Sequence, residues 1–187
     1  LNELFDLGLT DAQMAARVGR LGADCPVFIA NKPIYAEGKG DVFTELPVPL
    51  VQKSYFALPP VGSALPPTIS LSIPETLDGY WLVLVKPNDF ISTREAYASV
   101  TPAPSKVSLT DVISQPVRQW KGKMVNDFEA SVFPTHPVVS GICEQLYMLG
   151  ASYAAMSGSG STVYGLFRQQ PMLGDVFADH FQWQCRL

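Results

Sequence analysis

The stretch SYAAMSGSGSTVYGLF, residues 152–167, decides the fold of this chain. It contains two short and largely apolar runs, 152–156 and 162–167, on either side of the small residues Gly158-Ser159-Gly160. Runs of this length and composition are typical of strands, and glycines let the backbone turn tightly between them. The pattern therefore predicts two adjacent strands joined by a short turn.

A helix is expected directly before this strand pair. Residues 137–149 carry apolar side chains at helical spacing, Pro137 suits the first turn, and Gly150 suits the C-cap. The residues expected on its buried face are Val138, Ile142, Leu146 and Leu149.

The rest of the C-terminal part continues this mixture of strands and helices. From Tyr80 onward the order is strand, helices, strand, strand, helix, strand, which is typical of an α+β layer with helices on one face of a mainly antiparallel sheet. The remaining expected elements are a strand at 80–85, helices at 92–100, 110–120, 125–133 and 173–180, and a strand at 181–186.

The N-terminal part is distinct, and a proline-rich stretch separates it from the rest. Residues 47–79 hold seven of the chain's 16 prolines, which fix φ and remove amide donors, so we expect a long loop or linker there. The predicted parts are therefore 1–50, 51–79 and 80–187. The elements expected in the first are the last turns of a helix at 1–7, a helix from a Thr10–Gln13 capping box to about Gly22, and strands at 34–36 and 42–43.

Composition narrows the class of protein. The 187 residues are 47% hydrophobic and 16% charged, which suits a folded core. A net charge of −4 argues against a nucleic-acid partner, and no apolar run reaches membrane-spanning length. Three widely spaced cysteines fit a reducing compartment, so we expect a cytoplasmic protein. The chain opens without Met in what looks like a helix, so we expect a truncated product.

Asp24 is the first candidate for chemistry. It is a lone carboxylate in the apolar stretch LGADCPVF, residues 21–28, between a glycine and Pro26. A carboxylate held on a constrained backbone could accept a proton from a substrate hydroxyl. The alternative is a helix N-cap with Pro26 in the first turn, and spacing alone favours this alternative.

Two other segments contain candidate residues. The turn at 157–161 exposes amides and hydroxyls that suit an anion, although it lacks the Gly-Lys-Ser/Thr of a P-loop, and a simple hairpin turn is the favoured alternative. In the segment NDFE, Asn126 or Asp127 is expected to cap a helix with Glu129 at capping distance, and His136 is expected to mark a helix start. The residues alone thus indicate a cytosolic α+β protein with a candidate anion-binding turn.

Together, and in this order, these segments resemble the 4-diphosphocytidyl-2-C-methyl-D-erythritol kinase family of the GHMP kinase superfamily over nearly the whole chain. Residues 21–28 resemble its L-G-A-D-x-P-F/V-F signature, and residues 35–40 its A-x-G-x-G hairpin. Lys86-Pro87 with STREAY at 92–97 resembles the segment beside the substrate. NDFE resembles the N-D-F/L-E motif, and residues 157–161 resemble the third superfamily motif.

The resemblance implies a GHMP kinase-like fold, with a ferredoxin-like C-terminal layer and the remnant of a ribosomal-protein-S5-like N-terminal domain. It also implies transfer of the γ-phosphoryl group of ATP, with Mg²⁺, to the 2-hydroxyl of the cytidylyl methylerythritol substrate in non-mevalonate isoprenoid biosynthesis. The site residues that it implies are Asp24 as catalytic base, Gly158, Ser159 and Gly160 at the phosphates, and Thr93 and Tyr97 at the substrate.

Some family features have no counterpart in these 187 residues. They are the N-terminal Lys, the Tyr-His segment and the loop P-x-x-x-G-L-G-G-G-S-S, which would place a helix N-terminus at the ATP phosphates. The expectation is therefore that the isolated chain does not turn over substrate. The alternatives are another GHMP kinase, of the mevalonate, homoserine or galactose type, and a non-catalytic binding fragment.

Overall fold

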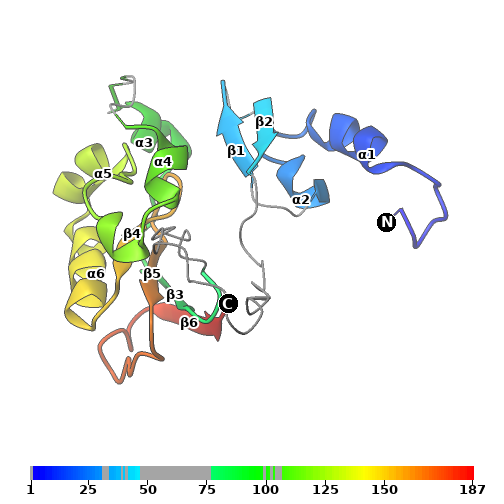
Figure 1. Ribbon diagram of the computed structural model, residues 1–187. Coiled ribbons are helices and arrows are strands. Elements are labelled where there is room, and N and C mark those ends of the chain that lie inside the picture. Colours follow the sequence, from blue (N-terminus) through cyan, green and yellow to red (C-terminus); the bar gives the residue numbers. More distant parts are fainter. Residues whose placement is uncertain are drawn as a thin grey trace, which may run out of the picture. The chain divides into compact units, whose positions relative to one another are not determined.

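The computed structural model describes residues 2–30, 34–38, 40, 42–46, 77–98, 100–101, 103 and 107–187 (Figure 1). The chain divides into two compact units, Leu1–Pro49 and Leu50–Leu187. Most of the proline-rich stretch, residues 47–76, lies outside the described residues. No helix among the described residues is long and apolar enough to cross a membrane.

The first helix of the first unit, α1 (Asp11–Val18), begins as its sequence predicts. The Gln13 amide donates to the Thr10 hydroxyl over 3.3 Å, and the Thr10 amide donates to the Gln13 side chain over 3.0 Å. This reciprocal pair satisfies two amides that a helix start leaves without partners. The helix ends at Val18 with Gly19 as its C-cap, three residues before Gly22.

Residues 2–6 form turns, so the helix expected at 1–7 is wrong over its described part. The Asn2 side chain donates to the Leu9 carbonyl over 2.9 Å and accepts from the Leu9 amide over 3.1 Å. Asp6 has a φ of +46°. Asparagine side chains compete with helical hydrogen bonding in this way, and one left-handed residue is enough to interrupt a helix.

The hairpin of the first unit is confirmed. Strands β1 (Ile34–Glu37) and β2 (Val42–Glu45) pair antiparallel, with Ile34 opposite Glu45 and Glu37 opposite Val42. Gly40, in the turn between them, has a φ of +82°, which a residue with a side chain rarely adopts. A short helix, α2 (Val27–Ala30), precedes the hairpin.

The second unit is built on one antiparallel sheet, as the sequence predicts. Its strand order is β4-β5-β3-β6, and each neighbouring pair is antiparallel. The pair around the glycine turn lies at one side of the sheet, and β3 lies between β5 and β6. The strands are β3 (Trp81–Lys86), β4 (Tyr153–Met156), β5 (Val163–Phe167) and β6 (Phe181–Arg186).

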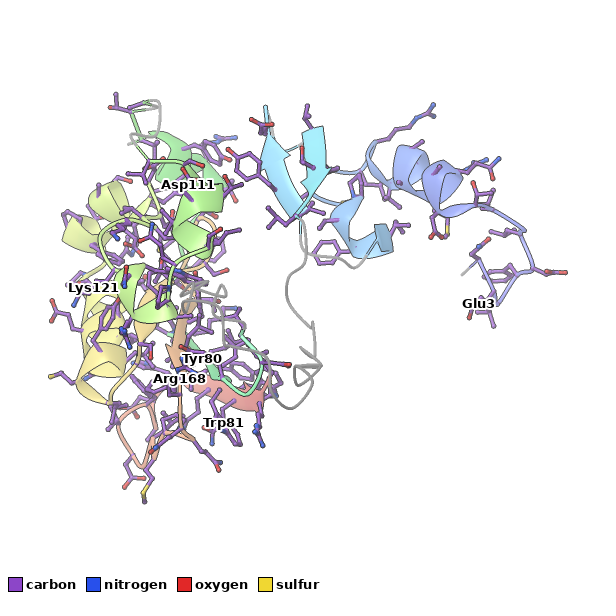
Figure 2. All side chains as sticks on the ribbon, in the orientation of Figure 1. Glu3, Tyr80, Trp81, Asp111, Lys121 and Arg168 are labelled. Carbon is purple, nitrogen blue, oxygen red and sulfur yellow. The ribbon has the colours of Figure 1, made fainter. Side chains whose placement is uncertain are left out.

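The C-terminal end of the chain is tied to the start of β3. Leu187 donates its amide to the Tyr80 carbonyl over 2.8 Å and accepts from the Gly79 amide over 3.1 Å. The ring of Tyr80 is buried, and the Arg168 guanidinium carbon lies 4.6 Å from its centroid (Figure 2). This cation–π contact lies at the end of the sheet opposite the glycine turn.

Helices cover one face of the sheet. Figure 1 shows α5 (Glu129–Thr135) above α6 (Pro137–Met148) on the same side of the sheet, and α6 packs on β4 and β5. Helix α3 (Thr93–Ala98) contributes Ala96 to the same core. The core residues from the sheet and α6 are Val83, Val85, Val139, Ile142, Cys143, Leu146, Ala154, Met156, Val163 and Phe167.

The opposite face is also covered, which the sequence analysis did not anticipate. Helix α4 (Leu109–Ile113) and the 3-10 helix η1 (Val117–Gln119) form a second apolar cluster against it. The single helix expected at 110–120 is divided because Pro116 cannot donate an amide to a continuing helix. The buried residues of this cluster are Tyr80, Val112, Val117, Trp120, Tyr153, Ala155 and Leu166.

Two further expectations differ from the structure. Helix α6 buries Ile142 and Leu146 as expected, but Val139 and Cys143 are buried beside them, whereas Val138 is 36% exposed and Leu149 is half-buried. Residues 174–179 form turns instead of a helix. In this segment Gly174 has a φ of +52°, and the backbone bonds join residues three apart, as from Val176 to Leu173 and from His180 to Phe177.

Candidate active site

The glycine turn between β4 and β5 has a conformation that requires glycine. Gly158 and Gly160 have φ values of +55° and +88°. A Cβ placed on Gly160 would lie 2.7 Å from the Met156 sulfur and 3.0 Å from the Ile91 Cδ1. Two backbone bonds shape the turn, from the Ser157 amide to the Thr162 carbonyl over 2.8 Å and from the Gly160 amide to the Ser157 carbonyl over 3.0 Å.

The turn keeps two amides available for a ligand. Within the described part of the chain, the Gly158 and Ser159 amides donate no hydrogen bond. Gly158 is exposed and Ser159 is half-buried. Successive unpaired amides on a glycine-containing turn form a concavity that suits an anion. This geometry fits the anion-binding alternative for residues 157–161.

The NDFE segment anchors this turn from 30 residues away. The side-chain nitrogen of Asn126, Nδ2, donates to the carbonyls of Met156 and Gly158, each over 2.8 Å. Its side-chain oxygen, Oδ1, accepts from the backbone amide of Phe128 over 3.0 Å. The Glu129 carboxylate accepts from the Met156 amide over 2.8 Å. Burial raises the pKa of Glu129, and the Met156 bond opposes this rise.

The cap expected for Asn126 or Asp127 is therefore wrong. The N-cap residue of α5 is Phe128, and no side chain caps that helix. Asn126 instead makes a local turn with the Phe128 amide, while its two donors reach the glycine turn. Nothing in the spacing of NDFE indicated these distant partners.

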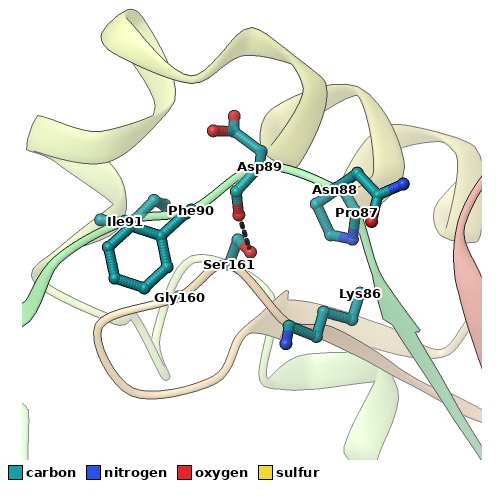
Figure 3. Close-up of a pocket in the computed structure, with 8 residues that line it drawn as sticks. All are labelled: Lys86, Pro87, Asn88, Asp89, Phe90, Ile91, Gly160 and Ser161. Atoms are coloured by element: carbon teal, nitrogen blue, oxygen red, sulfur yellow. Dashed lines mark hydrogen bonds between the residues drawn. The ribbon is translucent and has the colours of Figure 1, made fainter.

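A pocket of about 370 Å³ opens beside the turn (Figure 3). The loop after β3 forms one wall and the end of the glycine turn the other. Ser161, which is 5% exposed, joins the walls by donating from its hydroxyl to the Asp89 carbonyl. The lining residues are Lys86, Pro87, Asn88, Asp89, Phe90, Ile91, Gly160 and Ser161.

The two candidate substrate residues lie on α3. Thr93 is its first residue and is exposed. The Tyr97 ring packs edge-on against Phe128, with centroids 4.9 Å apart, yet Tyr97 remains 64% exposed. Because Phe128 belongs to NDFE, the structure brings α3 and the segment that anchors the glycine turn together. The Glu95 amide donates to the Ser92 hydroxyl over 3.1 Å, which is one half of the predicted capping box, whereas the Glu95 side chain lies against His136.

Asp24 lies in the first unit, in the turn before α2. It is exposed, and its carboxylate makes no hydrogen bond or ion pair within the described residues. Its Oδ1 lies 3.1 Å from the position that a Cβ on Gly40 would take. Since α2 begins at Val27, Asp24 is not its N-cap residue. That Asp24 and the glycine turn line the same site remains a prediction.

The sequence did not indicate one cluster of titratable side chains, formed by His136, Asp89 and Glu95. The His136 Nδ1 lies 3.0 Å and 2.9 Å from the two carboxylate oxygens of Asp89, and its Nε2 lies 3.3 Å from the Glu95 Oε1. His136 does stand at the start of α6, but its side chain makes no cap bond there. Its partners are 47 and 41 residues away in sequence, so no local pattern reveals them.

Comparison with known proteins identifies the family. A model of the GHMP kinases C-terminal domain matches residues 115–173. The chain is 46% identical to a 4-diphosphocytidyl-2-C-methyl-D-erythritol kinase of Bacteroides fragilis, covering 100% of this chain and 59% of that protein. The same kinase of Bacteroides thetaiotaomicron is 42% identical, covering 94% and 54%. The chain belongs to this kinase family.

A solved structure shows the same fold. A crystal structure of 4-(cytidine 5'-diphospho)-2C-methyl-D-erythritol kinase matches with a TM-score of 0.59 and 23% identity, covering 89% of this chain and 51% of that one. The chain thus spans between half and three-fifths of the length of these 4-diphosphocytidyl-2-C-methyl-D-erythritol kinases. The expected GHMP kinase-like α+β fold is confirmed.

The second unit contains three of the motifs by which the chain resembles the kinase family. The N-D-F/L-E motif contacts the strand end and turn of the third superfamily motif through Asn126, and it contacts the STREAY segment through Phe128 and Tyr97. The L-G-A-D signature and the hairpin lie together in the first unit. No group of three or more metal-ligating side chains occurs among the described residues, so the structure names no Mg²⁺ ligand.

Proposed function

We propose that this chain serves in an ATP-dependent kinase that transfers the γ-phosphoryl group of ATP to the 2-hydroxyl of 4-diphosphocytidyl-2-C-methyl-D-erythritol. This is a step of non-mevalonate isoprenoid biosynthesis, and we place it in the cytoplasm. The observation that carries the proposal is the glycine turn with its two available amides, in a chain 42–46% identical to kinases of that name. ATP with Mg²⁺ and the cytidylyl alcohol are the proposed ligands.

The glycine turn and its pocket have the chemistry for phosphates. Phosphoryl transfer depends mainly on positioning and on stabilising negative charge. The Gly158 and Ser159 amides would donate to phosphate oxygens, with Gly160 giving the turn its shape. Lys86 supplies a positive charge at the same pocket (Figure 3). The Gly158 carbonyl, which accepts from the Asn126 side chain, belongs to the same peptide group as the Ser159 amide, so this bond turns the Ser159 amide away from Asn126.

In this proposal Asp24 is the catalytic base, and α3 binds the substrate. The Asp24 carboxylate is exposed and has no partner among the described residues, so it would be available to accept the proton of a hydroxyl group as that group attacks phosphorus. The exposed Tyr97 ring offers a face to the cytosine base, and Thr93 offers a hydroxyl one turn away on the same helix.

The test uses a chimera in which this chain replaces the matching 188-residue segment of the Bacteroides fragilis relative. ADP release is measured with the cytidylyl alcohol and with free mevalonate, homoserine and galactose. We expect turnover with the cytidylyl alcohol alone, and a kcat about 10²–10⁴-fold lower for Asp24→Asn, the usual contribution of a general base.

The exposed Asp11→Asn is the matched control, since it removes a carboxylate from the same unit at the start of α1. Turnover of a free alcohol would point to another GHMP kinase, and full activity of Asp24→Asn would exclude Asp24 as the base. The isolated 187-residue chain is assayed beside the chimera and is expected to be inactive. A rate typical of kinases from that chain would contradict this expectation.

A further inference from the structure

His136 stands where three elements of the second unit meet. It follows α5 and precedes α6, while its ring reaches the β3–α3 loop through Asp89 and reaches α3 through Glu95. The His136 side chain is 14% exposed. The same loop and helix carry one wall of the pocket and the two candidate substrate residues. The ring therefore fixes the position of groups that the proposed reaction needs.

The hydrogen bonds depend on the protonation state of the ring. Both ring nitrogens face carboxylate oxygens, which accept hydrogen bonds and cannot donate them when ionised. A doubly protonated ring donates to Asp89 and Glu95 at once. A neutral ring has one N–H, which the closer Asp89 retains at 2.9 Å, so the contact with Glu95 at 3.3 Å is lost.

No other titratable group faces the ring among the described residues. The small cavity beside it is lined from α5 by Ser131, Val132 and Thr135, none of which ionises near neutral pH. The hydroxyls of Ser131 and Thr135 donate to backbone carbonyls of their own helix region. The ring therefore responds to the two carboxylates.

The electrostatics favour the doubly protonated ring. The Asp89 hydrogen bond raises the pKa of His136, burial opposes the rise, and Glu95 adds to it. Because the folded-state pKa lies above the ordinary 6.5, the stabilisation is complete below pH 6.5 and is lost as the pH rises through the folded-state value. The His136 ring therefore loses its second proton at a pH above the ordinary histidine value.

We propose that His136 is a positioning residue that holds the pocket loop through Asp89 and α3 through Glu95, and that loss of its second proton breaks the Glu95 contact and shifts α3, which Ala96 and Tyr97 still anchor. The Asp89 contact keeps the loop in place in both states, because a neutral ring retains its Nδ1–H. The pH-dependent part is α3, which carries Thr93 and Tyr97. The importance of this helix for catalysis rests on the proposed function, whereas the proton-linked movement does not.

The experiment is an NMR pH titration of the 187-residue chain without any ligand. The chain has only two histidines, so the His136 and His180 ring signals are easily separated. We expect a His136 midpoint above 6.5, a lower midpoint in Asp89→Asn, and backbone amides of α3 that shift with the His136 midpoint. The exposed Asp175→Asn, which removes a carboxylate from the turns before β6, should leave that midpoint unchanged.

Glu95→Gln separates positioning from general stability. A glutamine side chain can donate or accept, so it tolerates both ring states, and the α3 amides should no longer follow the ring titration. Two results would overturn the proposal: α3 amides that stay constant while the ring titrates, or a wild-type α3 response in Glu95→Gln. Neither result bears on kinase activity, because no nucleotide or alcohol is present.

Discussion

Gly160 has no room for a side chain at the end of the glycine turn. Its φ of +88° disfavours any residue with a Cβ, and the added atom would meet Met156 and Ile91 within 3.0 Å. We expect Gly160→Ala to lower the free energy of unfolding by roughly 1–2 kcal/mol from the backbone alone, with the contacts adding to this loss. Urea denaturation of the 187-residue chain measures the change.

Gly141 provides the matched control, because the same substitution has the opposite sign there. It lies inside α6, and a Cβ at this position would have no neighbour within 4 Å. Gly141→Ala should therefore raise the free energy of unfolding by about 0.5–1 kcal/mol, since alanine loses less backbone entropy in a helix. If both variants change stability equally, the strain assigned to the turn is absent.

At the scale of elements, Asn126 connects the loop before α5 with the β4–β5 turn. Asn126→Ala would leave the Met156 and Gly158 carbonyls without their donor, at a cost of about 1–3 kcal/mol for each one that stays buried. We expect a lower melting temperature and large amide shifts at Gly158 and Ser159. Asp127→Ala, at the exposed neighbouring position, should cause neither change, and equal effects would show that Asn126 is not the anchor.

The elements that the sequence predicts correctly are those whose signals are local. The Thr10–Gln13 capping box and the β4–β5 pair depend on residues a few positions apart. The helix expected at 173–180 fails because apolar spacing does not register the positive φ of Gly174. The roles of Asn126 and His136 were missed because their partners are 30 to 47 residues away and are set by tertiary packing.

At the scale of the molecule, the two units differ in their cores. Every residue of the first unit whose burial the structure describes is exposed or half-buried, and α1 has no buried residue. The second unit has two buried clusters, one on each face of its sheet. The candidate site is divided accordingly, with the predicted base Asp24 in the first unit and the glycine turn in the second. Physical patterning singled out both Asp24 and the turn as candidates but favoured a structural role for each, and only the family resemblance predicted that they belong to one site.

This difference predicts how the units behave when they are separated. Residues 77–187, which hold the whole four-stranded sheet and both clusters, should unfold cooperatively with a free energy of roughly 5–15 kcal/mol. Residues 1–49 should show no cooperative transition, because none of the residues whose burial is described in this segment is buried, and a segment of this size without a core cannot offset its conformational entropy. Circular dichroism during thermal unfolding distinguishes the two outcomes. A cooperative transition in the shorter fragment would mean that it possesses a core of its own, and a non-cooperative one in the longer fragment would mean that the sheet depends on residues 1–76 for its stability.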